Sequence, residues 1–181
     1  MGLKEQTRRR FDTLFYIAFQ DAKLEAKLDN QEVTSMQFTD PKAVLQSHID
    51  SELWLAPPQF WELSRMSNFT KFDDLKTFSM NRECRGCETW LPVLKPCTDG
   101  LFALYPGDNL YPEHPDYEGN QDVDMSGEES VHDSKFCSGN LNRMVQIGLH
   151  NYSIHVNIED PFGHLVPKNA PSPSKIENSK L

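Results

Sequence analysis

The sequence predicts a mixed α/β (α+β) fold, in which helices flank a sheet. Three observations lead to this prediction. Short aromatic-rich or alternating runs at 11–19 and 31–38 suit strands, helical stretches follow them at 42–49 and 59–66, and later apolar runs pair across turns. The periodicity therefore changes twice along the chain, from strands to helices and back to strands.

Two runs near the start are predicted to be strands. Residues 11–19 (Phe-Asp-Thr-Leu-Phe-Tyr-Ile-Ala-Phe) are nearly all apolar and rich in aromatic side chains, which is typical of a strand buried on both faces. In residues 31–38 polar and apolar side chains alternate more clearly, as in a strand with one face turned to water.

Helix-start signals follow the second run. Asp40 offers a capping side chain and Pro41 fits the first turn, so a helix is expected over 42–49. Residues 57–58 are prolines that end one element and begin the next. They lead into a second predicted helix at 59–66, with these apolar residues facing the core: Phe60, Trp61 and Leu63.

A third helix is predicted to run through Met80. Thr70, with Asp73 three residues later, resembles a capping box at its start. Large aromatic side chains dominate the buried area of small domains, so Trp54 and Phe69 are expected in the core rather than on a ligand-stacking surface.

The remaining ordered elements are predicted to be hairpins. Residues 91–105 contain two apolar runs around a Thr-Asp-Gly turn, and residues 143–158 pair across a turn at His150 and Asn151. His155 falls inside the second hairpin and is expected to be a half-exposed sheet residue.

Charge is distributed unevenly. The net charge is −9, and residues 107–134 hold nine acidic residues without a lysine or arginine, which accounts for the whole imbalance. An acidic chain argues against nucleic acid or an anionic membrane as a partner. The stretch 112–138 has too few apolar residues to bury and is expected to be a mobile loop.

The two ends and the cysteines bear on localisation. No run approaches the ~18 apolar residues of a membrane span, and the start lacks a secretory signal, so the chain is expected to be neither membrane-spanning nor secreted. The last three residues, Ser179, Lys180 and Leu181, are expected to be a peroxisomal address that a receptor reads from a flexible tail. The alternative is a chance tripeptide.

The four cysteines are expected to be free thiols, and a zinc site at Cys84, Cys87 and Cys97 is the weaker alternative.

Five segments together resemble a known family. They are residues 9–15 (Arg-Arg-Phe-Asp-Thr-Leu-Phe), 32–43 (Glu-Val-Thr-Ser-Met-Gln-Phe-Thr-Asp-Pro-Lys-Ala), 53–62 (Leu-Trp-Leu-Ala-Pro-Pro-Gln-Phe-Trp-Glu), 90–92 (Trp-Leu-Pro) and 104–108 (Leu-Tyr-Pro-Gly-Asp). In this order they resemble the C-terminal half of the peroxisomal Nudix hydrolases that act as acyl-coenzyme A diphosphatases.

The resemblance implies an incomplete Nudix-type mixed sheet with flanking helices, a C-terminal hairpin extension and a flexible tail. It also implies a hydrolase that uses Mg²⁺ or Mn²⁺ to cleave coenzyme A and acyl-coenzyme A. The products would be adenosine 3′,5′-bisphosphate and (acyl-)4′-phosphopantetheine, and a peroxisomal import receptor would be a partner. The domains would be 1–66 (Nudix part), 67–165 (extension with the acidic loop) and 166–181 (tail).

One departure from the family pattern limits the activity expected of this chain. The Nudix signature, which places several carboxylates on one helix to bind metal, is absent, and the Arg82-Glu83 pair is followed by Cys-Arg-Gly-Cys rather than by glutamates. In the family that helix would precede Met1. The chain alone is therefore expected to be inactive. The alternative is a non-catalytic coenzyme A-binding or regulatory protein.

Three residues remain as accessory candidates under the resemblance. Arg9 and Arg10 could meet phosphate oxygens, although a solvated basic end is the simpler interpretation. Glu32 lies where many Nudix enzymes keep an acidic residue, and could be a metal ligand or assist the base. A surface glutamate at a strand start is the competing interpretation. No main metal ligands are expected in this chain.

Overall fold

The structure is a computed structural model that describes residues 11–22, 27–28, 35–119, 126–160 and 162–168. The chain divides into two units, residues 1–36 and 37–181, and each is described by itself. Helices and an antiparallel sheet make up the described part of the second unit, so the predicted mixed α+β class is confirmed.

Both strands predicted near the start are wrong as far as the structure describes them. Residues 11–22 form no helix or strand, and Phe11 and Tyr16 are 80% and 86% exposed. Residues 35–38 are likewise irregular, while 31–34 lie outside the described residues. Apolar composition alone does not make a strand, because the backbone N–H and C=O groups need a neighbouring strand to pair with.

The predicted first helix is confirmed as α1, Pro41–Ile49. The Asp40 carboxylate accepts a hydrogen bond from the Lys42 amide at 2.7 Å and so caps the first turn. Leu45 and His48 are the buried side chains of this helix.

The second helix is also confirmed, and it begins two residues earlier than predicted. Helix α2 spans Pro57–Met66, with a proline in its first turn where the missing N–H costs nothing. Phe60 and Trp61 are buried, and Leu63 packs partly buried against the same cluster. Trp54 departs from the prediction, because 56% of it is exposed.

The third helix, α3, spans Phe72–Arg82 and leads into the short 3₁₀ helix η1, Glu83–Arg85. The predicted capping box is wrong: Lys71 occupies the cap position and no side chain caps the helix. The acidic residues Asp73 and Asp74 in its first turn favour the helix start through the helix dipole instead. Among the described residues, no helix is long and apolar enough to cross a membrane.

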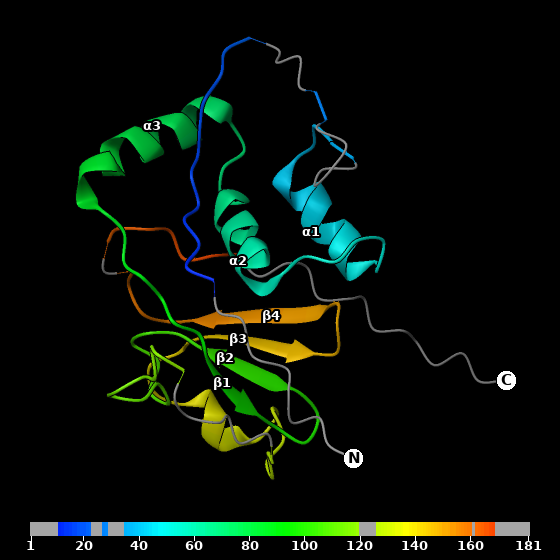
Figure 1. Cartoon of the computed structure of the whole chain (residues 1–181), viewed down its shortest axis with the longest axis vertical. Coiled ribbons are helices and arrows are strands. Elements are labelled where there is room, and N and C mark those ends of the chain that lie inside the picture. The colour runs from blue at the N-terminus through cyan, green and yellow to red at the C-terminus, as the bar shows by residue number, and fades with distance from the viewer. Residues whose placement is uncertain (1–10, 23–26, 29–34, 120–125, 161, 169–181) are drawn as a thin grey trace, which may run out of the picture. The chain divides into compact units, whose positions relative to one another are not determined.

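The sheet has four antiparallel strands in chain order (Figure 1). They are β1 (Val93–Pro96), β2 (Leu101–Leu104), β3 (Asn142–Ile147) and β4 (Asn151–Val156). Both predicted hairpins are therefore confirmed. The register pairs Phe102 with Val145 across β2 and β3, at the centre of the sheet.

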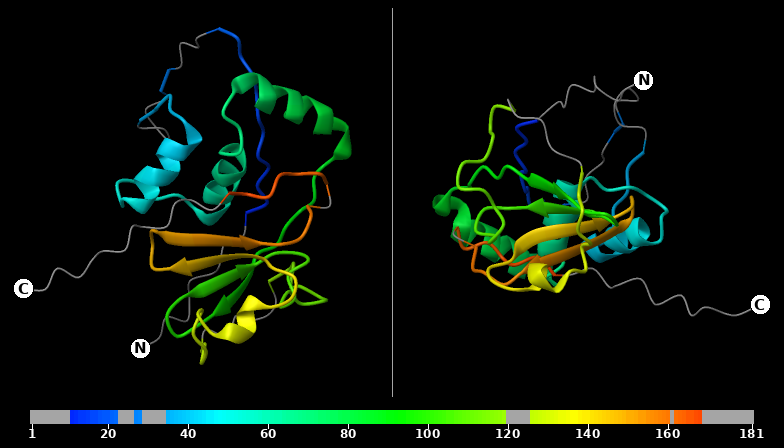
Figure 2. Two further views of the ribbon diagram at one scale, coloured as in Figure 1. Left: turned by 180° about the vertical axis from the view of Figure 1, so that it is seen from behind. Right: turned by 90° about the horizontal axis from the view of Figure 1, so that it is seen from below.

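Each face of the sheet packs against a separate apolar cluster. Alternation along β2 directs Ala103 to one cluster and Phe102 and Leu104 to the other. The first cluster includes side chains of α1 and α2, which Figures 1 and 2 show on the opposite side of the sheet from the 3₁₀ helix η2, Ser134–Cys137.

The acidic stretch is not a mobile loop over its described C-terminal part. Val131 and Phe136 are buried in the second cluster, and Phe136 packs edge-on against Phe102 with ring centroids 5.1 Å apart. Asp99, in the turn between β1 and β2, accepts hydrogen bonds from the Val131 amide at 2.8 Å and the Ser130 hydroxyl at 2.6 Å. Two apolar anchors and one carboxylate therefore order a segment whose overall composition is acidic.

Candidate functional site

Three aromatic side chains from separate segments meet above one face of the sheet. Trp61 of α2 packs against Tyr105, which follows β2, with ring centroids 4.5 Å apart, and against Trp90, which precedes β1, at 5.8 Å. Trp90 and Tyr105 lie 5.3 Å apart. Three of the segments that carried the resemblance, 53–62, 90–92 and 104–108, thus converge at one place.

Arg65 lies one helical turn after Trp61 and covers these rings. Its guanidinium carbon is 5.1 Å from the Trp90 ring centroid and 5.9 Å from that of Trp61, within cation–π range. Its Nη1 donates to Glu62 Oε1 at 2.9 Å and its Nη2 to Asp160 Oδ2 at 2.7 Å. With 8% of its surface exposed, Arg65 is a buried cation held by two carboxylates.

Asp160 also shapes the turn that follows β4. Its Oδ1 accepts hydrogen bonds from the amides of Phe162 and His164, at 3.1 and 3.3 Å. The one carboxylate therefore binds Arg65 with one oxygen and organises its own turn with the other. This ties α2 to the segment after the sheet.

The cavity at this cluster is too small for a substrate. It measures about 10 Å³ and is lined mainly by the two tryptophans, Arg65, Asp160 and the segment 165–167. A single water molecule needs about that much space. The described part of the site is a packed junction rather than a cleft.

Burial and local charge shift the titration of several groups here. Burial raises the pKa of Glu62, against the opposing effect of Arg65. Burial, and then the charges of Arg65 and Arg82, lower the pKa of His164 to about 4. Burial is also the main reason why the pKa of Arg82 is lowered, although Arg65 and Arg85 contribute as like charges.

The described residues do not fit a catalytic metal. Mg²⁺ and Mn²⁺ bind clusters of carboxylates, yet Glu62 and Asp160 are both occupied by Arg65. Within the part of the chain that the structure describes, no three His, Cys, Asp or Glu side chains gather around a common point. The four cysteines are free thiols, as predicted, and Cys84 and Cys87 are exposed.

A second buried ion pair holds the other face of the sheet. Asp108 follows β2 and receives two hydrogen bonds from Arg143 of β3, at 2.6 Å from Nε and 2.7 Å from Nη2. The remaining Arg143 nitrogen, Nη1, donates to the Phe136 carbonyl at 3.0 Å. This pair fixes the 104–108 segment and η2 together.

None of the residues predicted for the site can be placed. Arg9, Arg10, Glu32 and the targeting residues Ser179, Lys180 and Leu181 all lie outside the described residues. Sequence reasoning missed the pairs that the structure does place, Arg65 with Asp160 and Asp108 with Arg143. Two features of the sequence could have indicated these residues. Asp108 is the last residue of the segment 104–108 that carried the resemblance, and Arg65 lies four residues after Trp61 in a predicted helix.

Comparison with known families gives two matches to one family. The model described as the NUDT19 Nudix domain matches residues 2–66, and the model described as the NUDT19 C-terminal domain matches residues 96–157. No solved structure matches the chain.

Curated relatives agree with these matches. Proteins named acyl-coenzyme A diphosphatase NUDT19 from Gallus gallus, Xenopus laevis and Homo sapiens are 38%, 38% and 35% identical to the chain. The alignments cover 96%, 92% and 91% of this chain but 46%, 44% and 43% of those proteins. The chain thus spans less than half the length of the relatives it matches.

Proposed function

Because this chain belongs to the NUDT19 family, we propose that it is the C-terminal portion of an acyl-coenzyme A diphosphatase. The whole enzyme would hydrolyse the diphosphate of coenzyme A and acyl-coenzyme A. The products would be adenosine 3′,5′-bisphosphate and (acyl-)4′-phosphopantetheine. The main support is that all three relatives described above are named acyl-coenzyme A diphosphatase.

We further propose that this chain does not catalyse the reaction by itself. Its sequence lacks the Nudix signature, and the two carboxylates that the structure places at Arg65, those of Glu62 and Asp160, are neutralised by that arginine. Mg²⁺ or Mn²⁺ would be held by residues that this sequence does not contain. The chain would contribute the framework built on Trp61, Trp90 and Tyr105.

An activity assay tests whether the whole enzyme cleaves coenzyme A and this chain alone does not. The purified chain and the full-length Gallus gallus relative are incubated with coenzyme A and Mg²⁺ or Mn²⁺, and adenosine 3′,5′-bisphosphate is measured by chromatography. The relative should release it and the chain should not. Metal-dependent release by the chain alone would mean that other carboxylates, Glu32 first, bind the metal.

A second candidate is a non-catalytic coenzyme A-binding or regulatory protein. The missing Nudix signature in an otherwise matching chain favours it. Titration calorimetry of the chain with coenzyme A separates the two: saturable binding without cleavage supports the second candidate, whereas no binding by the isolated chain supports the incomplete enzyme.

Peroxisomal localisation is proposed from the last three residues. A fluorescent protein fused to the N-terminus of the chain should accumulate in peroxisomes through their import receptor. Removing Ser179, Lys180 and Leu181 should leave the fusion in the cytosol. Unchanged peroxisomal signal after the deletion would exclude this tripeptide as the address.

A further inference from the structure

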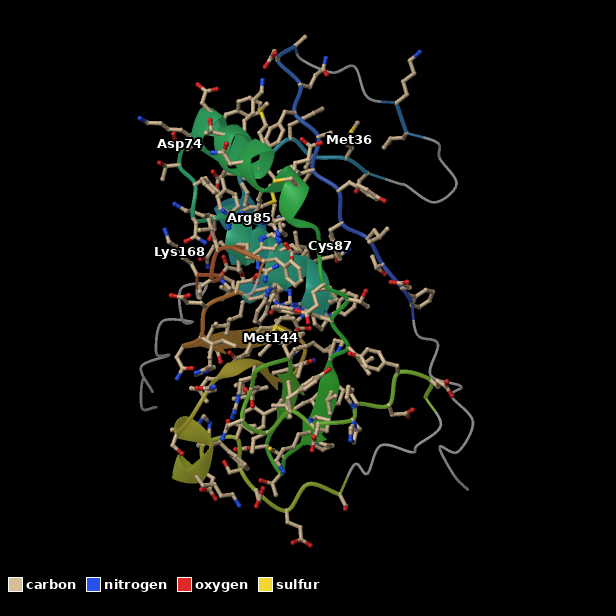
Figure 3. The ribbon with its side chains drawn as sticks, turned by 90° about the vertical axis from the view of Figure 1, so that its left-hand side faces the viewer. Met36, Asp74, Arg85, Cys87, Met144 and Lys168 are labelled. Carbon is tan, nitrogen blue, oxygen red and sulfur yellow. The ribbon has the colours of Figure 1, made fainter. Side chains whose placement is uncertain are left out.

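Three arginines gather around the turn that follows β4. Arg65 comes from α2, Arg82 ends α3 and Arg85 ends η1, and Figure 3 labels Arg85. A β-carbon on Gly163 would overlap the Arg85 guanidinium, so that side chain lies directly against the turn. The like charges of Arg65 and Arg85 both act on Arg82, which places the three cations within electrostatic reach of one another.

The positive charge of this group is only partly balanced. Both terminal nitrogens of Arg65 are bound to carboxylates, those of Glu62 and Asp160. No hydrogen bond or ion pair joins Arg82 or Arg85 to an acceptor within the described part of the chain. Two guanidinium groups, those of Arg82 and Arg85, are therefore left without a carboxylate partner among the described residues, in a chain whose net charge is −9.

Arg82 is also unsatisfied as a hydrogen-bond donor. Its Nε and Nη2 are buried and have no acceptor among the described residues. A buried charged donor without a partner carries the desolvation penalty of that group with no hydrogen bond to offset it. Turning this guanidinium toward a ligand would break none of the hydrogen bonds that the structure describes, so the side chain can be recruited at little cost.

We propose that Arg82 and Arg85 bind a phosphate group, either free or carried on a nucleotide. A phosphate dianion offers several acceptor oxygens, and two guanidinium groups are suited to bind it through paired charge-assisted hydrogen bonds. A carboxylate ligand fits less well, because it carries one charge where two arginines are available. The proposal does not depend on the diphosphatase activity, and it involves neither metal nor cleavage.

Nuclear magnetic resonance of the full chain tests the site directly. The arginine side-chain Nε–H signals are followed while inorganic phosphate, adenosine 3′,5′-bisphosphate or acetate is added at constant ionic strength. Signals of Arg82 and Arg85 should shift and saturate with either phosphate compound, and acetate should leave them unchanged. Tighter binding of the nucleotide would identify nucleotide-borne phosphate as the ligand, whereas equal binding would identify the phosphate group alone.

Matched variants show whether the two arginines are responsible. Arg82→Met and Arg85→Met should each weaken phosphate binding by about tenfold or more, as expected for the loss of hydrogen bonds to a charged group. Lys42→Met removes the same charge from an exposed position on α1 and should leave affinity unchanged. The site is refuted if phosphate causes no saturable shift, or if Lys42→Met weakens binding as much as the arginine variants.

Discussion

Arg143 and Asp108 form a bidentate ion pair inside the protein, with 2.6 and 2.7 Å between the paired atoms and almost no exposure of either side chain. Each carboxylate oxygen of Asp108 also accepts a hydrogen bond from a backbone amide. Oδ2 accepts from the Asn142 amide at 2.9 Å and Oδ1 from the Leu110 amide at 2.9 Å. The pair therefore joins β3 to the turn after β2.

Asp108→Asn should lower the free energy of unfolding by about 3–5 kcal/mol, because it leaves Arg143 as a buried charge without a counter-ion. Urea unfolding monitored by circular dichroism measures the loss. Glu129→Gln is the matched control, since Glu129 pairs with Lys95 and Lys135 at the surface and its substitution should have little effect. Equal losses for the two variants would contradict the structural role of the buried pair.

Trp61→Ala should cost about 3–5 kcal/mol of stability, as large-to-small changes of buried aromatic residues do. Trp61 is 3% exposed and contacts both Trp90 and Tyr105, so its removal leaves a void at the junction of three segments. Urea unfolding of Trp61→Ala and of Trp54→Ala provides the comparison. Trp54 is exposed, so Trp54→Ala should lower the free energy of unfolding much less. A larger loss for Trp54→Ala than for Trp61→Ala would contradict the packing of Trp61 against Trp90 and Tyr105.

Stability should fall as the pH is lowered from about 6.5 toward 4, in part because of His164. Its pKa in the folded chain is about 4, against an ordinary value of 6.5, through burial and the charges of Arg65 and Arg82. The unfolded chain therefore binds the proton more readily in this range, and this contribution to stability is complete only above pH 6.5. His164→Asn should flatten the slope of urea midpoint against pH. His132→Asn, at an exposed position, should keep the wild-type slope; an unchanged slope for His164→Asn would refute the prediction.

Gly127→Ala should release residues 126–138 from β1. A β-carbon at residue 127 would overlap the backbone carbonyl of Pro96 at the end of β1, and backbone cannot move aside as a side chain can. Limited proteolysis should then cut within 126–138 faster than in the unmodified chain. Gly148→Ala is the control: its β-carbon meets no atom within 4 Å, and the strain from its φ of 73° falls on the β3–β4 turn, so the cleavage rate of residues 126–138 should stay unchanged. Equal protection of both variants would show that the segment does not rest on β1.

Local signals in the sequence were sufficient for α1, α2 and both hairpins. The Asp40 cap, the prolines in the first turn of α2 and the Thr-Asp-Gly turn act over a few residues, so they favour these local structures with little dependence on distant contacts. The strand predicted at 11–19 is wrong because a strand depends on a contact beyond its own residues. Its apolar side chains are compatible with a strand, but a strand forms only where a partner strand pairs with it.

The sequence by itself determined the family, through five ordered segments, and the positions of the helices and hairpins, through capping, turn and periodicity signals. Only the tertiary structure decided which charges meet: Arg65 with Asp160, Asp108 with Arg143, and Arg82 beside Arg85 without a carboxylate of its own. The first two pairs join residues 95 and 35 positions apart. Contacts at such separations depend on the strand register and on helix packing, which no local pattern encodes.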